Sequence, residues 1–460
     1  MQNKNSIKKF FKLTPAKTII LGFLSIILIG AFLLCLPFSN VNHTWHNFVD
    51  ALFTSTSAVC VTGLMVFDVA MELSLFGQIV VLFLIQIGGL GFVTLTCLLI
   101  MLLGKKISYS TRITLQESLN KETTAGVVRM VRKIVIVMFS IEFVGFLCLA
   151  PSFVKFTGSF WSGCFKALFL SVSAFCNAGF DPLGNLTPEF SSLAYFINNP
   201  LFLTIVMLLV ITGGIGFVVL FDIFNLKKEN KKLSLHTKIV LYVTGILIFG
   251  GATLFAIFEW NNPNTIGNLS TFNKLVNCLF QSITPRTAGF ATLNQAGLTS
   301  GSVYITKFLM VVGGSSMSVA GGIKTTTLFV LFITLIKRTN ENGSINFAKR
   351  NISTKVIVKS VKLLLAYTML IALSSLNIYI IEMANGITYS QIVFECISAL
   401  STVGLTLGIT PALTVGSKLL LTLLMFIGRV GMLTLPLAFK PKNKIIENEI
   451  EFADSKIIVG

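Results

Sequence analysis

Long apolar runs separated by short polar segments occupy most of the chain. Each run carries few or no charges and is about as long as a membrane is thick, because a helix needs about 20 apolar residues to cross the hydrocarbon core. The runs cover residues 18–36, 75–103, 134–151, 200–225, 239–258, 303–336, 363–381 and 419–439. The pattern predicts eight membrane-spanning helices.

Shorter apolar segments lie between the paired runs, and a glycine-centred loop follows each of them. They are too short to cross a hydrocarbon core, so we expect re-entrant helices. The order span, half-length helix, loop, span occurs four times. It predicts an all-α integral membrane fold with four tandem repeats, eight transmembrane helices and four re-entrant pore helices around a central pore. The short segments are residues 47–58, 163–175, 272–284 and 389–400.

The four loops share a sequence pattern, written SAVCVTGL, SAFCNAGF, ITPRTAGF and SALSTVGL. Their anchoring glycines, Gly63, Gly179, Gly289 and Gly404, are separated by 116, 110 and 115 residues. This spacing predicts four repeats, over residues 18–103, 134–225, 239–336 and 363–439. The rest of the chain forms an N-terminus, three linkers and a C-terminal tail, over residues 1–17, 104–133, 226–238, 337–362 and 440–460.

Basic residues are concentrated in the termini and linkers, which hold 28 of the 36 Lys and Arg residues. By the positive-inside rule these segments face the cytoplasm, and an even number of spans places both termini there. The distribution argues against a nucleic-acid-binding patch, despite a formal net charge of +18. Orientation in the membrane and contact with anionic lipid are the two roles left open for this charge.

The overall composition agrees with a membrane protein and offers little for catalysis. With 54% hydrophobic and 12% charged residues, the chain has more apolar surface than a soluble domain can bury, and no cleavable signal peptide is evident. The three histidines and eight cysteines form no HExxH motif and no CxxC pair. A membrane-embedded enzyme would have to use Glu142, Lys324 and Arg429, so we expect a protein that is not an enzyme.

The glycine loops offer backbone carbonyls as ligands. A loop at membrane depth must be buried in protein or line water, and glycine permits conformations that aim successive carbonyls inward. Four such loops would form a ring of oxygens that replaces the hydration shell of a cation, and four helix C-termini would add partial negative charge. Four ordinary tight turns are the alternative. The expected cation-binding residues are Val61, Thr62, Gly63, Asn177, Ala178, Gly179, Thr287, Ala288, Gly289, Thr402, Val403 and Gly404.

The sixth apolar run is too long for one span. As a helix, residues 303–336 would measure about 50 Å against a hydrocarbon core of about 30 Å, and helix propensity disfavours the GGSSMSVAGG within it. We expect a loop below the filter that blocks or opens the conduction path, with a rigid packing kink as the alternative. The expected gate residues are Gly313, Gly314, Ser315, Ser316, Met317, Ser318, Val319, Ala320, Gly321, Gly322, Lys324 and Arg429.

Several residues inside apolar runs need close neighbours or partners. Arg429 follows Gly428 in a run where a cation costs at least about 3 kcal/mol, and beside the glycine-rich loop it would set an electrostatic barrier. Snorkelling to the interface is the alternative. Arg286 should point behind its loop to acidic or carbonyl partners, and Glu142 should be paired or line water. Small residues such as Gly88 and Gly213 permit close helix contact.

The ordered motifs TSAVCVTGL, NAGF, TPRTAGF and STVGLT, together with GGSSMSVAGGIKT, resemble the Trk/Ktr/HKT superfamily of potassium transporters. The length and the eight spans look most like the membrane subunits of bacterial Ktr systems, of the KtrB or KtrD kind. The resemblance covers essentially the whole chain. It implies potassium uptake across the bacterial cell membrane, either passive or coupled to sodium, with the loops above as selectivity filter and residues 313–322 with Arg429 as gate.

The resemblance also implies partners. Members of this family act as homodimers in which each subunit has its own pore, docked on a cytoplasmic ring of nucleotide-binding RCK-type subunits (KtrA/KtrC-like). The C-terminal tail IIENEIEFADSKIIVG would contribute to the dimer contact. The chain itself contains no Walker motif and no GxGxxG in a strand-to-helix context, so we expect no cofactor in it and a nucleotide on the partner. The alternative function is the potassium-translocating subunit of a P-type ATPase complex.

Overall fold

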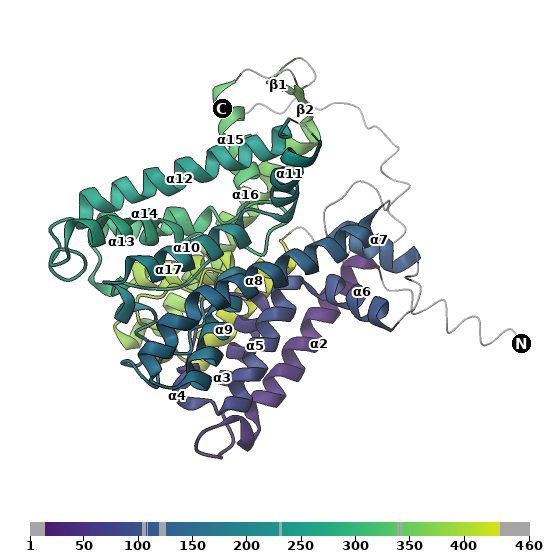
Figure 1. The fold of residues 1–460 in the computed structure, drawn as a ribbon. Coiled ribbons are helices and arrows are strands. Elements are labelled where there is room, and N and C mark those ends of the chain that lie inside the picture. The colour runs from purple at the N-terminus through teal and green to yellow at the C-terminus, as the bar shows by residue number, and fades with distance from the viewer. Residues whose placement is uncertain are drawn as a thin grey trace, which may run out of the picture.

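The structure, a computed structural model, describes residues 14–103, 107, 109–118, 126–229, 232–337, 340, 343–348 and 350–432. The predicted C-terminal tail and most of the predicted N-terminal segment lie outside the described residues. Within them the protein is almost entirely helical, and the helices surround a common centre (Figure 1).

Four long helices open the four quarters of the described chain. All four are long and apolar enough to cross a membrane. The second and fourth extend beyond the predicted runs into residues that the sequence assigned to linkers, because a helix can continue past the hydrocarbon core with polar side chains in water. The four helices are α2 (Pro15–Cys35), α8 (Val127–Thr157), α12 (Leu235–Glu259) and α16 (Thr354–Glu382).

Each long helix is followed by a short one close to the predicted position. The side chains of Asn47 and Ser270 cap two of their N-termini, and Thr388 forms a capping box with Gln391 at a third. These short helices are the best-buried elements of each quarter. They are α3 (Phe48–Cys60), α9 (Phe160–Cys176), α13 (Thr271–Ile283) and α17 (Tyr389–Ser401).

The second helix is broken in each of the first three quarters, whereas the sequence predicted a break for the third quarter alone. The apolar runs 75–103 and 200–225, predicted as continuous spans, turn at Gly91 (φ +77°) and Gly216 (φ +97°). Only glycine adopts such φ values without a steric penalty. The two halves of the second-quarter span are bent by 102°. The helices before these breaks are α5 (Leu75–Leu90), α10 (Pro200–Gly214) and α14 (Ser300–Val311). The corresponding helix of the fourth quarter is α18 (Val415–Val430), and residues 433–439 of its predicted run lie outside the described residues.

Short elements complete the described chain. Helices α6 (Phe92–Leu102), α11 (Phe217–Glu229) and α15 (Thr325–Ile336) continue after the three breaks. Strands β1 (Ile345–Phe347) and β2 (Arg350–Ile352) form an antiparallel hairpin before α16. The remaining elements are helices α4 (Val69–Glu72) and α7 (Tyr109–Ser118) and the 3₁₀ turns η1 (Pro37–Ser39), η2 (Ala194–Phe196), η3 (Gln295–Gly297), η4 (Met383–Asn385) and η5 (Thr410–Ala412).

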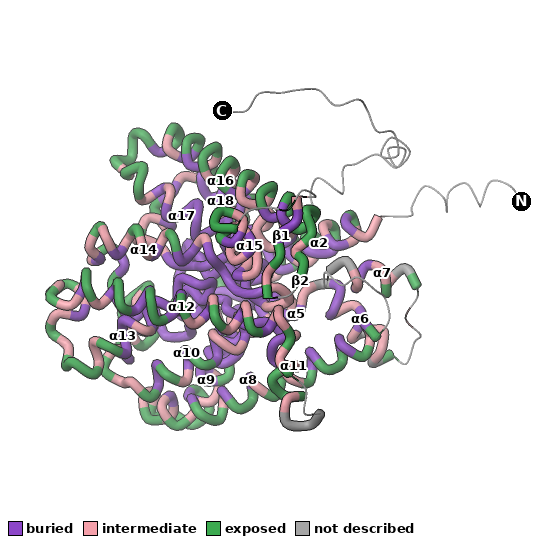
Figure 2. Tube along the Cα trace, turned by 90° about the horizontal axis from the view of Figure 1, so that it is seen from above, coloured by how far each residue is buried: buried purple, intermediate pink, exposed green. Residues whose placement is uncertain are grey.

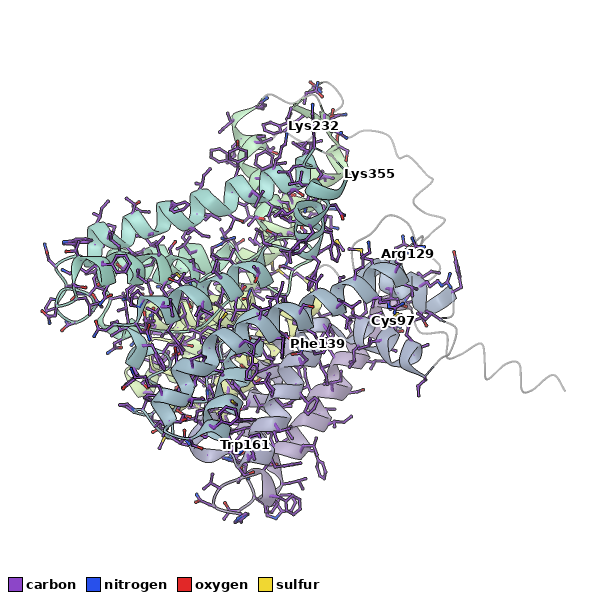
Figure 3. All side chains as sticks on the ribbon, viewed as in Figure 1. Cys97, Arg129, Phe139, Trp161, Lys232 and Lys355 are labelled. Atoms are coloured by element: carbon purple, nitrogen blue, oxygen red, sulfur yellow. The ribbon has the colours of Figure 1, made fainter. Side chains whose placement is uncertain are left out.

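Burial follows the pattern expected of a protein surrounded by lipid. Buried residues gather in the middle of the molecule and exposed ones lie around its rim (Figure 2). Phe53, Phe169 and Phe394, each ten residues before a loop glycine, are fully buried. Phe139 and Trp161 lie on the outer surface, where apolar side chains can contact acyl chains (Figure 3). Figure 3 also places the basic residues Arg129, Lys232 and Lys355 away from the end that carries Trp161.

Candidate functional site

The four short helices end in loops with one shared backbone pattern. In each loop a residue with positive φ is followed, two positions later, by the anchoring glycine, also with positive φ. Three of the four non-glycine residues are β-branched, and a left-handed conformation costs such residues about 1–2 kcal/mol. Tertiary packing must hold this strain. The pairs are Val61 (φ +57°) and Gly63 (+93°), Asn177 (+58°) and Gly179 (+72°), Thr287 (+73°) and Gly289 (+78°), and Thr402 (+53°) and Gly404 (+95°).

The four loops form a closed ring, backbone against backbone. A Cβ atom placed on any anchoring glycine would lie within 3.0 Å of a carbonyl oxygen of the next loop in the ring. The fourth loop returns to the first, so the four segments surround one axis. The contacts, from glycine to carbonyl, are Gly63 to Ala178 (2.6 Å), Gly179 to Ala288 (3.0 Å), Gly289 to Val403 (2.4 Å) and Gly404 to Thr62 (2.3 Å).

Buried hydroxyl groups hold the loops in this shape. The Ser57 and Ser398 hydroxyls accept hydrogen bonds from the amides of Gly63 (3.0 Å) and Gly404 (3.1 Å). In the second loop the hydroxyl of Ser173 donates to the carbonyl of Phe180 (2.6 Å). All three serines stand six residues before a loop glycine. Sequence reasoning missed these residues, although alignment of the repeats on their glycines shows a serine at this position in three of the four.

Glycines of the second helices lie directly against the ends of the short helices. A Cβ atom on Gly88 would lie 2.3 Å from the carbonyl oxygen of Val59, which precedes Gly63 by four residues. Gly213 and Gly428 meet the equivalent carbonyls of Phe175 (1.9 Å) and Leu400 (2.1 Å). The predicted close contact is therefore present in three quarters. In the third quarter, a Cβ atom on Gly313 would instead lie 2.1 Å from the carbonyl oxygen of Gly321, within the loop that is inserted between α14 and α15.

Residues 313–324 form this inserted loop, between α14 and α15, as predicted. Its two ends are joined, because the Gly313 amide donates to the Ile323 carbonyl (3.1 Å) and the Ile323 amide donates to that of Val311 (3.0 Å). The loop also contacts two other quarters. The Ser315 amide donates to the carbonyl of Gly214 at the break after α10 (2.9 Å), and Gly321 packs against the Ser401 carbonyl below the fourth loop.

Two cationic side chains hold the inserted loop. The guanidinium of Arg429 donates to the carbonyls of Val319 and Gly88, so it joins the loop to α5 of the first quarter. Lys324 donates through Nζ to the carbonyls of Ala320 and Gly321. Both cationic groups therefore lie at the break, with backbone carbonyls as their hydrogen-bond partners. Arg286 likewise donates to a carbonyl, that of Gly313 (3.4 Å).

Glu142 is paired rather than solvated. It is 3% exposed, and its carboxylate accepts hydrogen bonds from the Gln86 amide (3.0 and 3.3 Å) and the Cys176 thiol (3.7 Å). Cys176 is the last residue of α9, and Gln86 lies two residues before Gly88. The carboxylate therefore ties the second loop to the helix that Arg429 contacts. The sequence indicated that Glu142 needs a partner but did not identify Gln86, which lies 56 residues away in the chain.

We expect Glu142→Leu to lower the midpoint of thermal unfolding by several degrees, because two buried donors lose their acceptor at a cost of about 1–3 kcal/mol. Fluorimetric unfolding of the purified protein would measure this. Glu142→Gln keeps an acceptor, so its unfolding midpoint should fall less than that of Glu142→Leu. Ser140→Ala, at an exposed position on the same helix, serves as the control. Equal midpoints for wild type and Glu142→Leu would contradict the pairing.

A carboxylate lies just beyond the second loop. Asp181, two residues after Gly179, is 5% exposed and accepts from the Leu183 amide (3.1 Å). Nearby, Lys166 donates to the Pro182 carbonyl. Burial, with a further contribution from the Asp68 carboxylate, raises the pKa of Asp181 to about 7. The group is therefore neutral below that pH and negatively charged above it.

If cations pass through the ring, their uptake should depend on external pH through Asp181. Between pH 6 and 8 the carboxyl loses its proton, so the added negative charge should lower the half-saturating cation concentration several-fold. Uptake assays at varied external pH would measure this. Asp181→Asn should remove most of the dependence, whereas Glu189→Gln, at an exposed position nearby, should retain it. A profile unaffected by Asp181→Asn would contradict the assignment.

This arrangement defines a multi-pass helical membrane transport protein. Its candidate site is built from backbone carbonyls and buried cationic side chains. The chain belongs to the family described as TrkH, cation transport protein, whose profile matches residues 8–448. It is therefore a transport protein and not an enzyme.

Individual relatives agree with this assignment. The chain is 38% identical, over 99% of both chains, to Ktr system potassium uptake protein B of Bacillus subtilis (strain 168). It is 37% identical, also over 99% of both, to potassium/sodium uptake protein NtpJ of Enterococcus hirae. The fold matches the crystal structure of the potassium transporter TrkH from Vibrio parahaemolyticus with a TM-score of 0.70, at 18% identity, over 91% of this chain and 85% of that one.

Proposed function

We propose that this protein is the ion-conducting membrane subunit of a Ktr-type potassium uptake system. The closed ring of four glycine loops carries the proposal. The relatives named above support potassium as the cargo, since their names describe potassium uptake or potassium/sodium uptake. Those names favour uptake over the alternative of a subunit in a P-type ATPase complex.

The ring acts as the selectivity filter. Alternating φ signs at Thr62, Gly63 and their equivalents aim successive carbonyls toward the axis, where the oxygens replace the water shell of a potassium ion. The C-terminal ends of the short helices add partial negative charge at the loops, which favours cations and rejects anions. The filter residues are those named from the sequence, three in each loop.

The inserted loop acts as the gate. It lies between the four quarters, with its ends joined to each other and its middle tied to α10 and to Arg429. Arg429 sets an electrostatic barrier to cations. Its hydrogen bonds also hold the inserted loop against α5. Because the ties are hydrogen bonds to single carbonyls, a modest displacement of α10 or α5 releases them. Such displacement opens the path.

The membrane potential suffices to drive uptake. With eight spans and both termini in the cytoplasm, potassium enters toward the negative side, and one charge crossing 100 mV gains about 2.3 kcal/mol, which corresponds to about fiftyfold accumulation. A homodimer docked on a ring of RCK-type subunits, with nucleotide bound to that ring, would regulate the gate. Sodium is a co-ion or a weaker cargo, consistent with the name of the second relative.

Flux measurements in liposomes test this function. Purified protein should carry potassium and rubidium faster than sodium under an imposed potential, and addition of an RCK partner with nucleotide should raise the flux. An absence of cation flux under every gradient, with and without the partner, would overturn the proposal. Equal flux of all three cations would contradict the filter but not the pore.

A further inference from the structure

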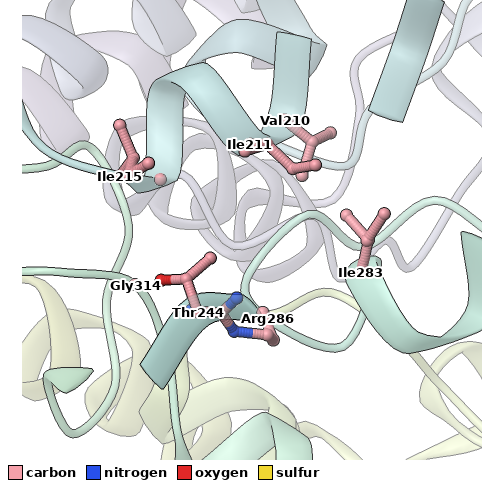
Figure 4. A pocket seen from close by; sticks show the side chains of 8 residues that line it. Val210, Ile211, Ile215, Thr244, Ile283, Arg286 and Gly314 are labelled. Carbon is pink, nitrogen blue, oxygen red and sulfur yellow. The ribbon is translucent and has the colours of Figure 1, made fainter. Parts of the chain in front are cut away.

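A small cavity lies behind the third loop. It lies between α10, α12, the end of α13 and the inserted loop, and has a volume of about 20 Å³ (Figure 4). Aliphatic side chains such as Ile211, Ile215 and Ile283 form most of its wall. Two polar side chains also line it, those of Thr244 and Arg286. The cavity therefore touches the second quarter, the third quarter and the gate at once.

Both polar side chains have unpaired atoms. Arg286 is 8% exposed, and its Nε atom is buried without a hydrogen-bond partner. The Thr244 hydroxyl, on a residue that is also 8% exposed, is buried without a partner too. Among the described residues, no carboxylate lies within 4 Å of the Arg286 guanidinium. Figure 4 shows both side chains at the wall of the cavity.

The buried guanidinium of Arg286 has no counter-charge among the described residues around it. Arginine stays protonated in proteins, and a buried charge without a counter-charge costs several kcal/mol. Among the described residues, its hydrogen-bond acceptor is the Gly313 carbonyl, at 3.4 Å. The neighbouring Gly314 carbonyl, at the cavity wall, already accepts from the Thr325 amide (3.2 Å). The cavity thus presents the guanidinium donors of Arg286 together with one hydroxyl, which can donate or accept.

Charge and donor chemistry together select the ligand. A water molecule fits a cavity of this volume and can donate to the Thr244 hydroxyl, but it leaves the charge of Arg286 uncompensated. A halide ion needs donors alone and is the counter-charge that Arg286 lacks. Aliphatic walls suit a large, weakly hydrated monatomic anion better than a hydrated one.

We propose that this cavity binds one halide ion, chloride under ordinary salt conditions, held by Arg286 and Thr244. The bound anion neutralises the cation behind the third loop and joins that loop to α12, which carries Thr244, while Arg286 also contacts the Gly313 carbonyl of the inserted loop. It therefore stabilises the gate in the arrangement described here. This inference stands on the cavity and does not depend on which cation crosses the membrane.

Thermal unfolding of the purified full chain, titrated with chloride or bromide against gluconate at constant ionic strength, tests the site. The wild type should show a saturable rise in midpoint with either halide. Thr244→Val keeps the shape and removes the hydroxyl, so its half-saturating halide concentration should rise about tenfold. Arg286→Gln should abolish the response. Thr253→Val, exposed on the same helix, should behave as wild type.

Bromide also locates the site directly. Crystals of the full chain grown in bromide should show an anomalous peak beside the Arg286 guanidinium, and Thr244→Val crystals should show a weaker one. Ordered water alone at this position, or a halide response that Thr244→Val leaves unchanged, would overturn the proposal. Because neither readout requires transport, failure here is distinguishable from failure of the proposed uptake function.

Discussion

Gly404→Ser is expected to raise the half-saturating potassium concentration for uptake by at least about tenfold and to reduce discrimination against sodium. At φ +95° a serine pays about 1–2 kcal/mol of backbone strain, and its Cβ would lie 2.3 Å from the Thr62 carbonyl oxygen and 2.9 Å from the Gly63 Cα. The first loop must move, so the ring loses its closure at the contact that joins its two ends. Rubidium uptake with sodium competition in potassium-depleted cells measures both effects.

The chain supplies a matched control for this change. Gly408 has a similar φ of +88° in the same loop region, but a Cβ atom there meets nothing within 4 Å. Gly408→Ser therefore introduces comparable backbone strain without a clash in the ring, and uptake should stay close to wild type. If both variants impair uptake equally, backbone strain rather than ring geometry is responsible, and the filter assignment for Gly404 loses its support.

Deletion of Ser315–Ala320 is expected to raise cation flux in liposomes at least about tenfold without an activating partner. The deletion removes the part of the inserted loop that contacts α10 and Arg429, and it leaves the bridge between Val312 and Ile323 that joins the loop ends. Removal of both the obstruction and its ties leaves the path open, since a barrier of 1.36 kcal/mol corresponds to a factor of ten in rate.

A single substitution tests the same gate by another route. Arg429→Gln removes the charge but keeps a side chain that can donate a hydrogen bond, so flux should rise less than in the deletion variant. Arg429→Lys keeps the charge and should stay nearer to wild type. A folded deletion protein, judged by gel filtration and unfolding midpoint, with unaltered or abolished flux would show that the loop is a packing kink rather than a gate.

Much of the site could be predicted from sequence, because its parts are local. The start and end of each short helix fall within three residues of the prediction, as in α17 (Tyr389–Ser401) against 389–400. Helix length, capping residues and glycine position are all properties of one segment. The inserted loop was predictable for the same reason, since a span of its length cannot stay helical between two membrane surfaces.

The parts that could not be predicted depend on contacts between segments far apart in the chain. Hydropathy is continuous through Gly91 and Gly216, so nothing in composition distinguishes a broken span from a straight one there. The breaks become evident only in the structure, where Gly91 and Gly216 have positive φ. Arg429 hydrogen-bonds to Gly88, 341 residues away, and no local pattern specifies that partner. The difference between the third quarter and the other three depends on such contacts.

Anomalous scattering from rubidium in crystals of the full chain tests the central claim most directly. The account predicts a peak on the axis of the ring. Carbonyl oxygens of all four loops should coordinate the ion, among them those of Thr62, Ala178, Ala288 and Val403. The peak should be lost or displaced in Gly404→Ser. Rubidium bound only elsewhere, with the ring axis free of it at saturating concentration, would contradict the claim that these four loops form a cation filter.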